Sequence, residues 1–151
     1  MSVSARGRLF QVGGVILILA GGGIAAYLAW PRSNLPQPGS ALYDEYLRAF
    51  QVGVAALDAE RPDIAYPRLD RAIELVPAEP AGWANRGLLH LRKHEKDDAA
   101  RDLQRAYALA PDSGEIEALL GQLARMQGNL PEAAAHLRKA VEKDPRDLGS
   151  I

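Results

Sequence analysis

The 151-residue sequence contains no cysteine. This absence excludes disulfide bonds, thiolate metal sites, cysteine nucleophiles and an anchor attached through an acylated cysteine. Acidic residues are missing from the first 39 positions, where Arg6, Arg8 and Arg32 are the only charged side chains. All 19 acidic residues and the other 15 basic residues follow, so the remainder has a formal charge of about −4. A mildly acidic domain argues against nucleic acid as a partner, because phosphates require a basic surface.

Charge is also absent from Leu9 to Trp30, a run that is almost wholly apolar. As a helix it would be about 33 Å long, which matches the hydrocarbon core of a bilayer. Tyr27 and Trp30 at its end suit the headgroup layer, and Pro31 would stop the helix. The run over 9–30 therefore predicts a single transmembrane anchor.

The flanking charges predict the orientation of this anchor. Arg6 and Arg8 lie in the short tail over 1–8, whereas only Arg32 follows the anchor closely. The positive-inside rule then places the N-terminus in the cytoplasm and the domain in the periplasm or outside the cell. The chain would be a single-pass protein of the inner (cytoplasmic) membrane. A cleaved signal peptide with a small-x-small site at 23–25 is the alternative, although apolar residues continue beyond that site.

A proline-rich linker over 31–40 separates the anchor from the domain. Pro31, Pro36 and Pro38 favour an extended and fairly stiff spacer. Ser40, at its end, is a plausible N-cap for the helix that follows.

The part of the chain over 41–147 contains an internal repeat. Pro77, Pro111 and Pro145 stand at equal intervals, and four further columns keep the same interval through three units: Gly53, Gly87 and Gly121; Ala65, Ala99 and Ala133; Leu69, Leu103 and Leu137; Ala72, Ala106 and Ala140. A period of about 34 residues indicates a solenoid of two-helix units. The glycine allows the two helices of a unit to approach closely, and the leucine and second alanine fill the layer to the next hairpin.

The apolar periodicity and the breakers predict six helices, over 41–58, 62–76, 80–94, 96–109, 113–127 and 130–143. Pro62 and Pro131 suit first-turn positions. Pro67 falls inside the second helix, where a proline costs about 3 kcal/mol. We therefore expect either a kink there or a helix that begins near Tyr66.

This pattern resembles the tetratricopeptide repeat (TPR) family, in units over 46–79, 80–113 and 114–147, with a short tail over 148–151. The second unit carries the clearest match, in Trp83, Gly87, Ala99, Leu103, Ala106 and Pro111. The resemblance implies an all-α fold, a right-handed α-solenoid of three helical hairpins. The sequence departs from the family where Arg86 replaces a leucine and where Ala49 and Glu117 replace the tryptophan. Repeat arrays normally end in a capping helix, so we expect the last hairpin to dock on a partner or to continue into a longer protein.

Few side chains point to chemistry. His90 and His94 stand one helical turn apart, a spacing that can hold a metal, but no third ligand accompanies them. We interpret His90 as a packed side chain and His94 as a loop residue. Asp97 and Asp98 are adjacent and suit the first turn of a helix. We therefore expect no enzyme activity, no cofactor and no metal.

The resemblance implies that the first helices of the three hairpins line a concave groove for a peptide segment or a helix. The candidate partner-binding residues are Phe50, Val54, Asn85, Leu88, Arg92, Leu119, Gln122 and Arg125, and the wider lining also includes Leu47, Gln51, Leu57, Ala84, Leu91, Glu115, Ala118 and Met126. One branch of the family grips C-terminal carboxylates with basic and asparagine side chains, and only Asn85 matches it here. An open apolar face usually marks a partner site, whereas a terminal helix in the groove or self-association into a homo-oligomer is the alternative.

The sequence therefore predicts a membrane-anchored interaction scaffold that recruits or holds partners in envelope assembly, secretion or cytochrome maturation. The pathway is an analogy from proteins of similar design. The alternative is a structural subunit of a stable membrane complex, packed through its transmembrane helix.

The predicted topology can be tested with a reporter fused after Ile151 and by mapping the mature N-terminus. We expect reporter activity outside the cytoplasm and a retained anchor, because Arg6 and Arg8 precede the apolar run. A reporter active only in the cytoplasm, or a mature chain that begins near Ala26, contradicts the prediction.

Overall fold

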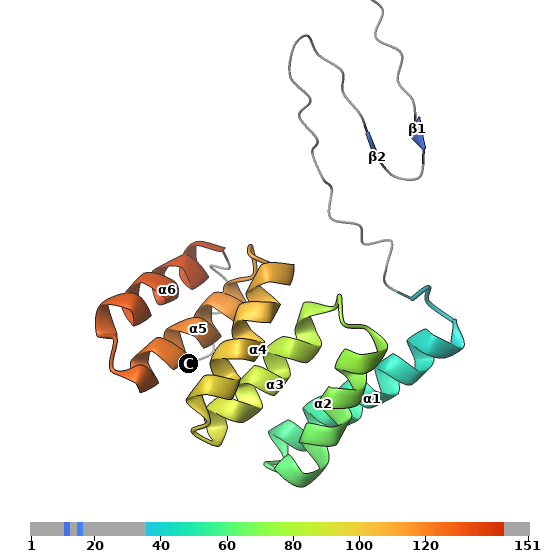
Figure 1. Ribbon diagram of the computed structural model, residues 1–151, viewed down its shortest axis with the longest axis horizontal. Coiled ribbons are helices and arrows are strands. Elements are labelled where there is room, and N and C mark those ends of the chain that lie inside the picture. Colours follow the sequence, from blue (N-terminus) through green and yellow to red (C-terminus); the bar gives the residue numbers. More distant parts are fainter. Residues whose placement is uncertain (1–10, 13–14, 17–35, 144–151) are drawn as a thin grey trace, which may run out of the picture. The chain divides into compact units, whose positions relative to one another are not determined.

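The computed structural model describes residues 11–12, 15–16 and 36–143 (Figure 1). The chain divides into two compact units, Met1–Asn34 and Leu35–Ile151. In the first, β1 (Gln11–Val12) pairs antiparallel with β2 (Val15–Ile16), with Val12 opposite Val15. Two glycines separate the strands in the sequence, a composition typical of hairpin connections.

The transmembrane helix expected over 9–30 falls mostly outside the described residues. The four that are described within it are extended rather than helical. In the described parts of the chain, no helix has both the length and the apolar character needed to cross a bilayer. The anchor therefore stays a prediction.

Residues 36–143 of the second unit contain six helices, which confirm the expected ones with ends that differ by two residues at most. They are α1 (Ala41–Asp58), α2 (Pro62–Leu75), α3 (Pro80–Arg92), α4 (Lys96–Leu109), α5 (Gly114–Gln127) and α6 (Leu130–Lys143). Consecutive helices pack as three hairpins, α1 with α2, α3 with α4 and α5 with α6, and α2 and α4 each pack against the hairpin that follows (Figure 1).

Local capping fixes where several helices begin. The Ser40 hydroxyl accepts a hydrogen bond from the Tyr43 backbone N–H at 3.2 Å, which confirms the expected N-cap of α1. Helix α2 begins at Pro62, and the Ala65 N–H already donates to the Arg61 carbonyl. A start near Tyr66 is therefore wrong, because a proline in the first position presets the backbone angle and removes only a donor that has no partner there.

The glycine column brings the two helices of each hairpin together. A Cβ atom built on Gly53 would lie 2.9 Å from Leu69, and one on Gly87 would lie 2.8 Å from Leu103. On Gly121 the corresponding distance to Leu137 is 3.0 Å. The first two distances are shorter than Cβ atoms normally approach, and the third is tighter than most such contacts. The close approach in each hairpin therefore depends on the first helix lacking a side chain at this point.

The leucine and alanine columns form the core in the first two units. Leu69 and Leu103 are both 0% exposed, because the following hairpin covers them. Leu137 occupies the same column and is 46% exposed. The expectation that it fills a layer to a next hairpin is therefore wrong within residues 36–143, where no helix follows α6.

Replacing Gly87 with leucine should lower the free energy of unfolding by about 1–3 kcal/mol, because the new side chain collides with Leu103. Thermal unfolding followed by circular dichroism should show a midpoint several degrees lower. Ala108→Leu, on the exposed side of α4, adds the same residue without a collision and serves as the control. Equal midpoints for the two variants contradict this packing.

Candidate partner-binding face

The first helices of the three hairpins form a continuous row. Helix α1 contacts α3, and α3 contacts α5, so one face of the unit presents side chains from all three repeats. We call this surface the α1–α3–α5 face. The eight predicted site residues lie on these three helices. Six are partly buried and two, the arginines, are exposed: Phe50, Val54, Asn85, Leu88, Leu119 and Gln122 in the first set, Arg92 and Arg125 in the second.

The large apolar members of this set also support the fold. Phe50 stacks on Tyr46 with ring centroids 5.8 Å apart and packs against the first core cluster. Leu88 packs against the cluster that contains Leu57, and Leu119 contacts two clusters between the second and third hairpins. These side chains therefore have an internal packing role as well as an exposed side, since each packs against a core cluster.

Three residues of the wider lining do not reach the surface. Leu57, Ala84 and Leu91 are each at most 4% exposed. They belong to the core clusters where α1, α3 and α5 meet, so the neighbouring first helix covers them. The accessible part of the face is therefore narrower than the sequence indicated.

Two polar members of the set are held by backbone groups. The Asn85 side-chain amide donates to the Ala81 carbonyl of its own helix at 2.9 Å. The Arg92 guanidinium donates to the Leu57 carbonyl at 2.5 Å, from α3 to the last turn of α1. Arg92 therefore ties the first hairpin to the second, while much of its side chain stays exposed.

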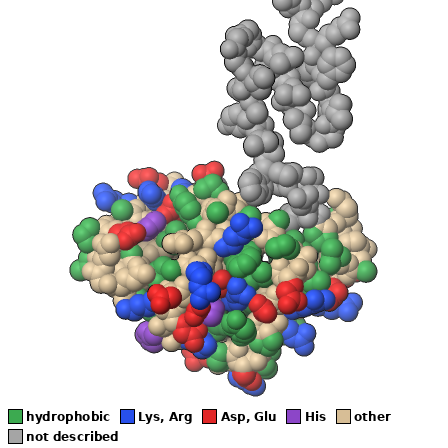
Figure 2. Space-filling model, viewed as in Figure 1, with side chains coloured by type: hydrophobic (Ala, Val, Ile, Leu, Met, Phe, Trp, Pro, Cys, Tyr) green, Lys and Arg blue, Asp and Glu red, His purple; other side chains and the backbone are tan. Residues whose placement is uncertain are grey.

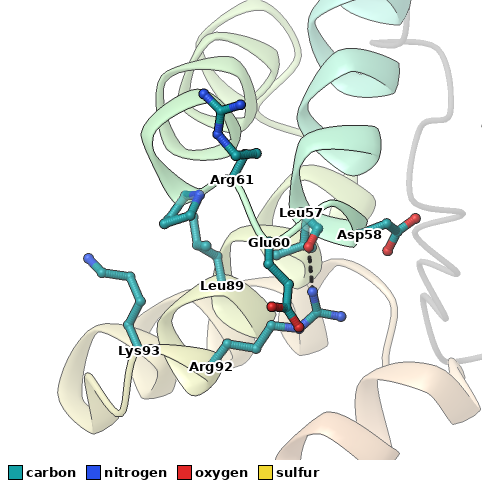
Figure 3. A pocket seen from close by; sticks show the side chains of 8 residues that line it. Leu57, Asp58, Glu60, Arg61, Leu89, Arg92 and Lys93 are labelled. Carbon is teal, nitrogen blue, oxygen red and sulfur yellow. Dashed lines mark hydrogen bonds between the residues drawn. The ribbon is translucent and has the colours of Figure 1, made fainter.

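A pocket of about 600 Å³ opens beside this arginine (Figure 3). Leu57 and Leu89 form its apolar side, and its rim carries charges of both signs from the α1–α2 turn and the end of α3. The rim and floor residues are Asp58, Glu60, Arg61, Pro62, Arg92 and Lys93. Sequence reasoning missed this pocket because it is built from turn residues, which the repeat columns do not mark.

A partly buried ion-pair network joins the first two hairpins. Arg86 on α3 makes a two-pronged contact with the Asp102 carboxylate on α4, at 2.7 and 2.8 Å. Its third nitrogen reaches Asp70 on α2 at 2.5 Å. The side-chain hydrogen bond to Asp102 raises the pKa of Arg86. An arginine therefore replaces the usual leucine because two carboxylates compensate its charge.

His90 is buried, as expected of a packed side chain. Its Nδ1 lies 2.6 Å from a Glu95 carboxylate oxygen, and its ring meets Tyr66 edge-on. The structure brings Glu95 and Asp98, rather than His94, next to His90, with one ligand atom from each of the three within 4.8 Å of the others. Lys93 pairs with Glu95, and Arg101 pairs with Asp98, so cationic side chains compensate both carboxylates.

Glu117 occupies the tryptophan column of the third unit and is fully buried. His136 and Lys143, both on α6, contact its two carboxylate oxygens at 2.7 and 2.8 Å. Burial of the carboxylate raises its pKa, but the hydrogen bonds from these two side chains and the charge of Lys143 outweigh it, so the pKa is lowered. This triad holds α6 against α5 where an aromatic ring is absent.

The triad makes the stability of the third hairpin depend on pH. Because the folded pKa of Glu117 lies below its ordinary value of 4.5, its contribution is present at neutral pH and is lost as the pH falls through the folded pKa. The destabilisation caused by Glu117→Gln should therefore be largest near pH 7 and should shrink below about pH 4.5. Chemical unfolding of the wild type and of Glu117→Gln across this pH range measures the difference in their free energies of unfolding. Glu115→Gln, on the exposed side of α5, is the control. A difference between the wild type and Glu117→Gln that is constant from pH 7 to pH 3 contradicts the assignment.

Comparison with known proteins agrees with this architecture. The family model of the tetratricopeptide repeat matches residues 50–114 and 85–147. No curated protein matches the chain significantly. Among solved structures, "MamA MSR-1 C2" is similar with a TM-score of 0.59 and 24% identity over 68% of this chain and 59% of that one.

Two further structures are similar in fold. The second TPR of Spaghetti (RPAP3), bound to the HSP90 peptide SRMEEVD, has a TM-score of 0.63 and 19% identity over 69% of this chain and 98% of that one. YrrB, a TPR protein with an unusual peptide-binding site, has a TM-score of 0.61 and 20% identity over 68% of this chain and 53% of that one. The present chain thus spans little more than half the length of MamA and YrrB.

Proposed function

Because this chain belongs to the tetratricopeptide repeat family, we propose that its helical unit is a non-catalytic scaffold that binds a segment of a partner protein on the α1–α3–α5 face. The observation that carries the proposal is the row of three first helices with side chains that are neither buried nor fully solvated. Phe50, Leu88 and Leu119 are anchored in the core on one side and partly exposed on the other. In protein interfaces a few well-packed residues that lose their water on binding contribute most of the energy.

The composition of the face favours one kind of segment. In the related RPAP3 domain the ligand is an HSP90 peptide. Here the clamp for a terminal carboxylate is mostly replaced by apolar or acidic side chains, and only Asn85 remains. Phe50, Val54 and Leu119 favour an apolar segment, with Gln122 and Arg125 available for its backbone or an acidic side chain. On the face that Figure 2 shows, positive and negative side chains are interspersed, an arrangement that favours protein over nucleic acid as a partner.

We further propose that the run over 9–30 anchors the scaffold in the inner membrane, with the helical unit in the periplasm or outside the cell. Support comes from the length and apolar character of the run and from the arginines before it. A helix is also the form in which one segment satisfies all its backbone groups inside a bilayer. The scaffold would then hold partners in envelope assembly, secretion or cytochrome maturation. Alternatively the chain is a structural subunit of a stable membrane complex, packed through this helix.

Site-specific photocrosslinking of the full chain in its own membrane tests the face. A photoreactive residue at Gln122 should give a discrete crosslinked partner, because this side chain lies on α5 at the edge of the apolar anchors. The same residue at Gln104, an exposed glutamine on α4, is the matched control and should give none. Phe50→Ala should lower the yield of the crosslinked product at Gln122 at least tenfold, because the partner binds less tightly.

Because Phe50 also packs on Tyr46, thermal unfolding of Phe50→Ala must be measured alongside the crosslink. A crosslink that survives in a folded Phe50→Ala protein, or that forms equally at Gln104, argues against the face. Crosslinks confined to photoreactive residues within 9–30 would instead favour the membrane-complex alternative.

A further inference from the structure

The outer side of α6 carries a continuous apolar stripe, which we call the α6 stripe: Leu130, Ala134, Leu137 and Val141. Its residues are spaced by four, three and four, so they lie in one line along the helix. Leu130 is 65% exposed, Leu137 46% and Val141 40%, and Ala134 is exposed as well. Exposed apolar side chains that are contiguous, rather than scattered, indicate a surface that another element covers.

The solenoid itself shows what covers such a stripe. On α4, one repeat earlier, the corresponding residues Ala100, Leu103 and Tyr107 pack in clusters with apolar residues of α5 at the same kind of spacing, Ile116, Leu120 and Leu123. On α2, the corresponding Leu69 and Ile73 are buried beside α3, whereas Tyr66 is 42% exposed. In both layers the cover is a single helix. Helix α5 presents apolar residues at intervals of four and three, whereas α3 presents Gly82, Arg86 and Leu89 in the same columns.

The positive charge of Arg138 beside the stripe indicates which kind of helix could cover it. Arg138 stands one repeat after Gln104 and two repeats after Asp70, and Asp70 receives Arg86 from the covering helix α3. On α6 this column therefore carries a positive charge, where α2 carries a negative one. Among residues 36–143 no carboxylate pairs with Arg138, which reaches only the Ala134 carbonyl of its own helix. A covering helix with an acidic residue in the position of Arg86 would complete the pair.

A second copy stacked end to end does not satisfy these conditions. It would present α1 to the stripe, with Arg48, Val52 and Ala55 in the columns that α5 fills with Ile116, Leu120 and Leu123. Arg48 would then face Val141, and Val52 would face Arg138. Both arginines would lose water without gaining a carboxylate, which is unfavourable.

We propose that the α6 stripe binds an amphipathic helix of a partner protein, one that carries an acidic side chain opposite Arg138. This surface is separate from the α1–α3–α5 face, so the scaffold would hold two partners at once.

The proposal can be tested with peptides based on α5, residues 114–127, held helical by a lactam bridge on the side away from the stripe. One peptide carries Leu120→Glu, the position that would face Arg138, and the other carries Leu120→Lys. Fluorescence anisotropy with the full chain in detergent should show that the glutamate peptide binds at least tenfold more tightly. Arg138→Glu should reverse this order, and Arg68→Glu, at an exposed arginine on α2, should leave it unchanged. Val141→Glu should abolish binding of both peptides without changing the helical content.

Other occupants give distinct results, each of which overturns the proposal. Leu137→Cys would introduce the only thiol of the chain. Its rate of reaction with a maleimide shows whether another element covers the stripe, because a covered thiol reacts slowly. If neither peptide binds and the full chain is a dimer that Val141→Glu dissociates, a second copy covers the stripe. If the chain is monomeric and the thiol is protected until residues 144–151 are removed, that segment covers it. An unprotected thiol with no peptide binding leaves the stripe without an occupant.

Discussion

The structure depends on the close approach of two helix backbones in each hairpin. At Gly53 and Gly87 even one methyl group would collide with a leucine of the second helix, and at Gly121 the leucine would have to shift. Glycine lowers the stability of an isolated helix by about 1 kcal/mol, so this column is favourable only because it lets a leucine of the second helix pack directly against the first. The angle and spacing that result then decide how the next hairpin stacks and which side chains remain on the α1–α3–α5 face.

Stacking uses different chemistry at each layer, although the backbone arrangement repeats. Between the first and second hairpins an arginine joins two carboxylates from flanking helices. Between the second and third the layer is apolar, through Ile116 and Leu120. Within the third hairpin a buried carboxylate held by a histidine and a lysine takes the place of a tryptophan. Buried ion pairs contribute little net stability compared with apolar packing. A stacking register that separates the partners, however, leaves a buried charge without compensation. These networks therefore favour one register of stacking over its alternatives.

The arrangement of the helices could be predicted from the sequence, because it follows from features that recur at one fixed interval. That interval places the glycines and leucines, and the prolines and Ser40 place the ends. The networks could not be predicted in the same way. Arg86 reaches Asp70 and Asp102, each 16 residues away, and Glu117 reaches Lys143 across 26 residues. Such pairs occur once and leave no periodic signal. The burial of Leu57 and Leu91 was missed for a related reason, since a groove position and a contact between adjacent first helices share one face of the helix.

Leu137 shows why a repeat column does not determine the surroundings of its members. Leu69, Leu103 and Leu137 are identical residues at identical positions, and each packs on the glycine of its own hairpin. That contact is internal to the repeat and is kept three times. The contact with the following layer is external to the repeat and depends on what comes next, so two of the leucines are fully buried and the third is nearly half exposed. Burial in a solenoid is therefore the sum of an intrinsic term and a nearest-neighbour term. The stripe around Leu137 keeps the apolar character of a covered layer, but Arg138 stands where the earlier layers have Asp70 and Gln104. The sequence of α6 is therefore suited to a covering helix unlike any in the hairpins before it.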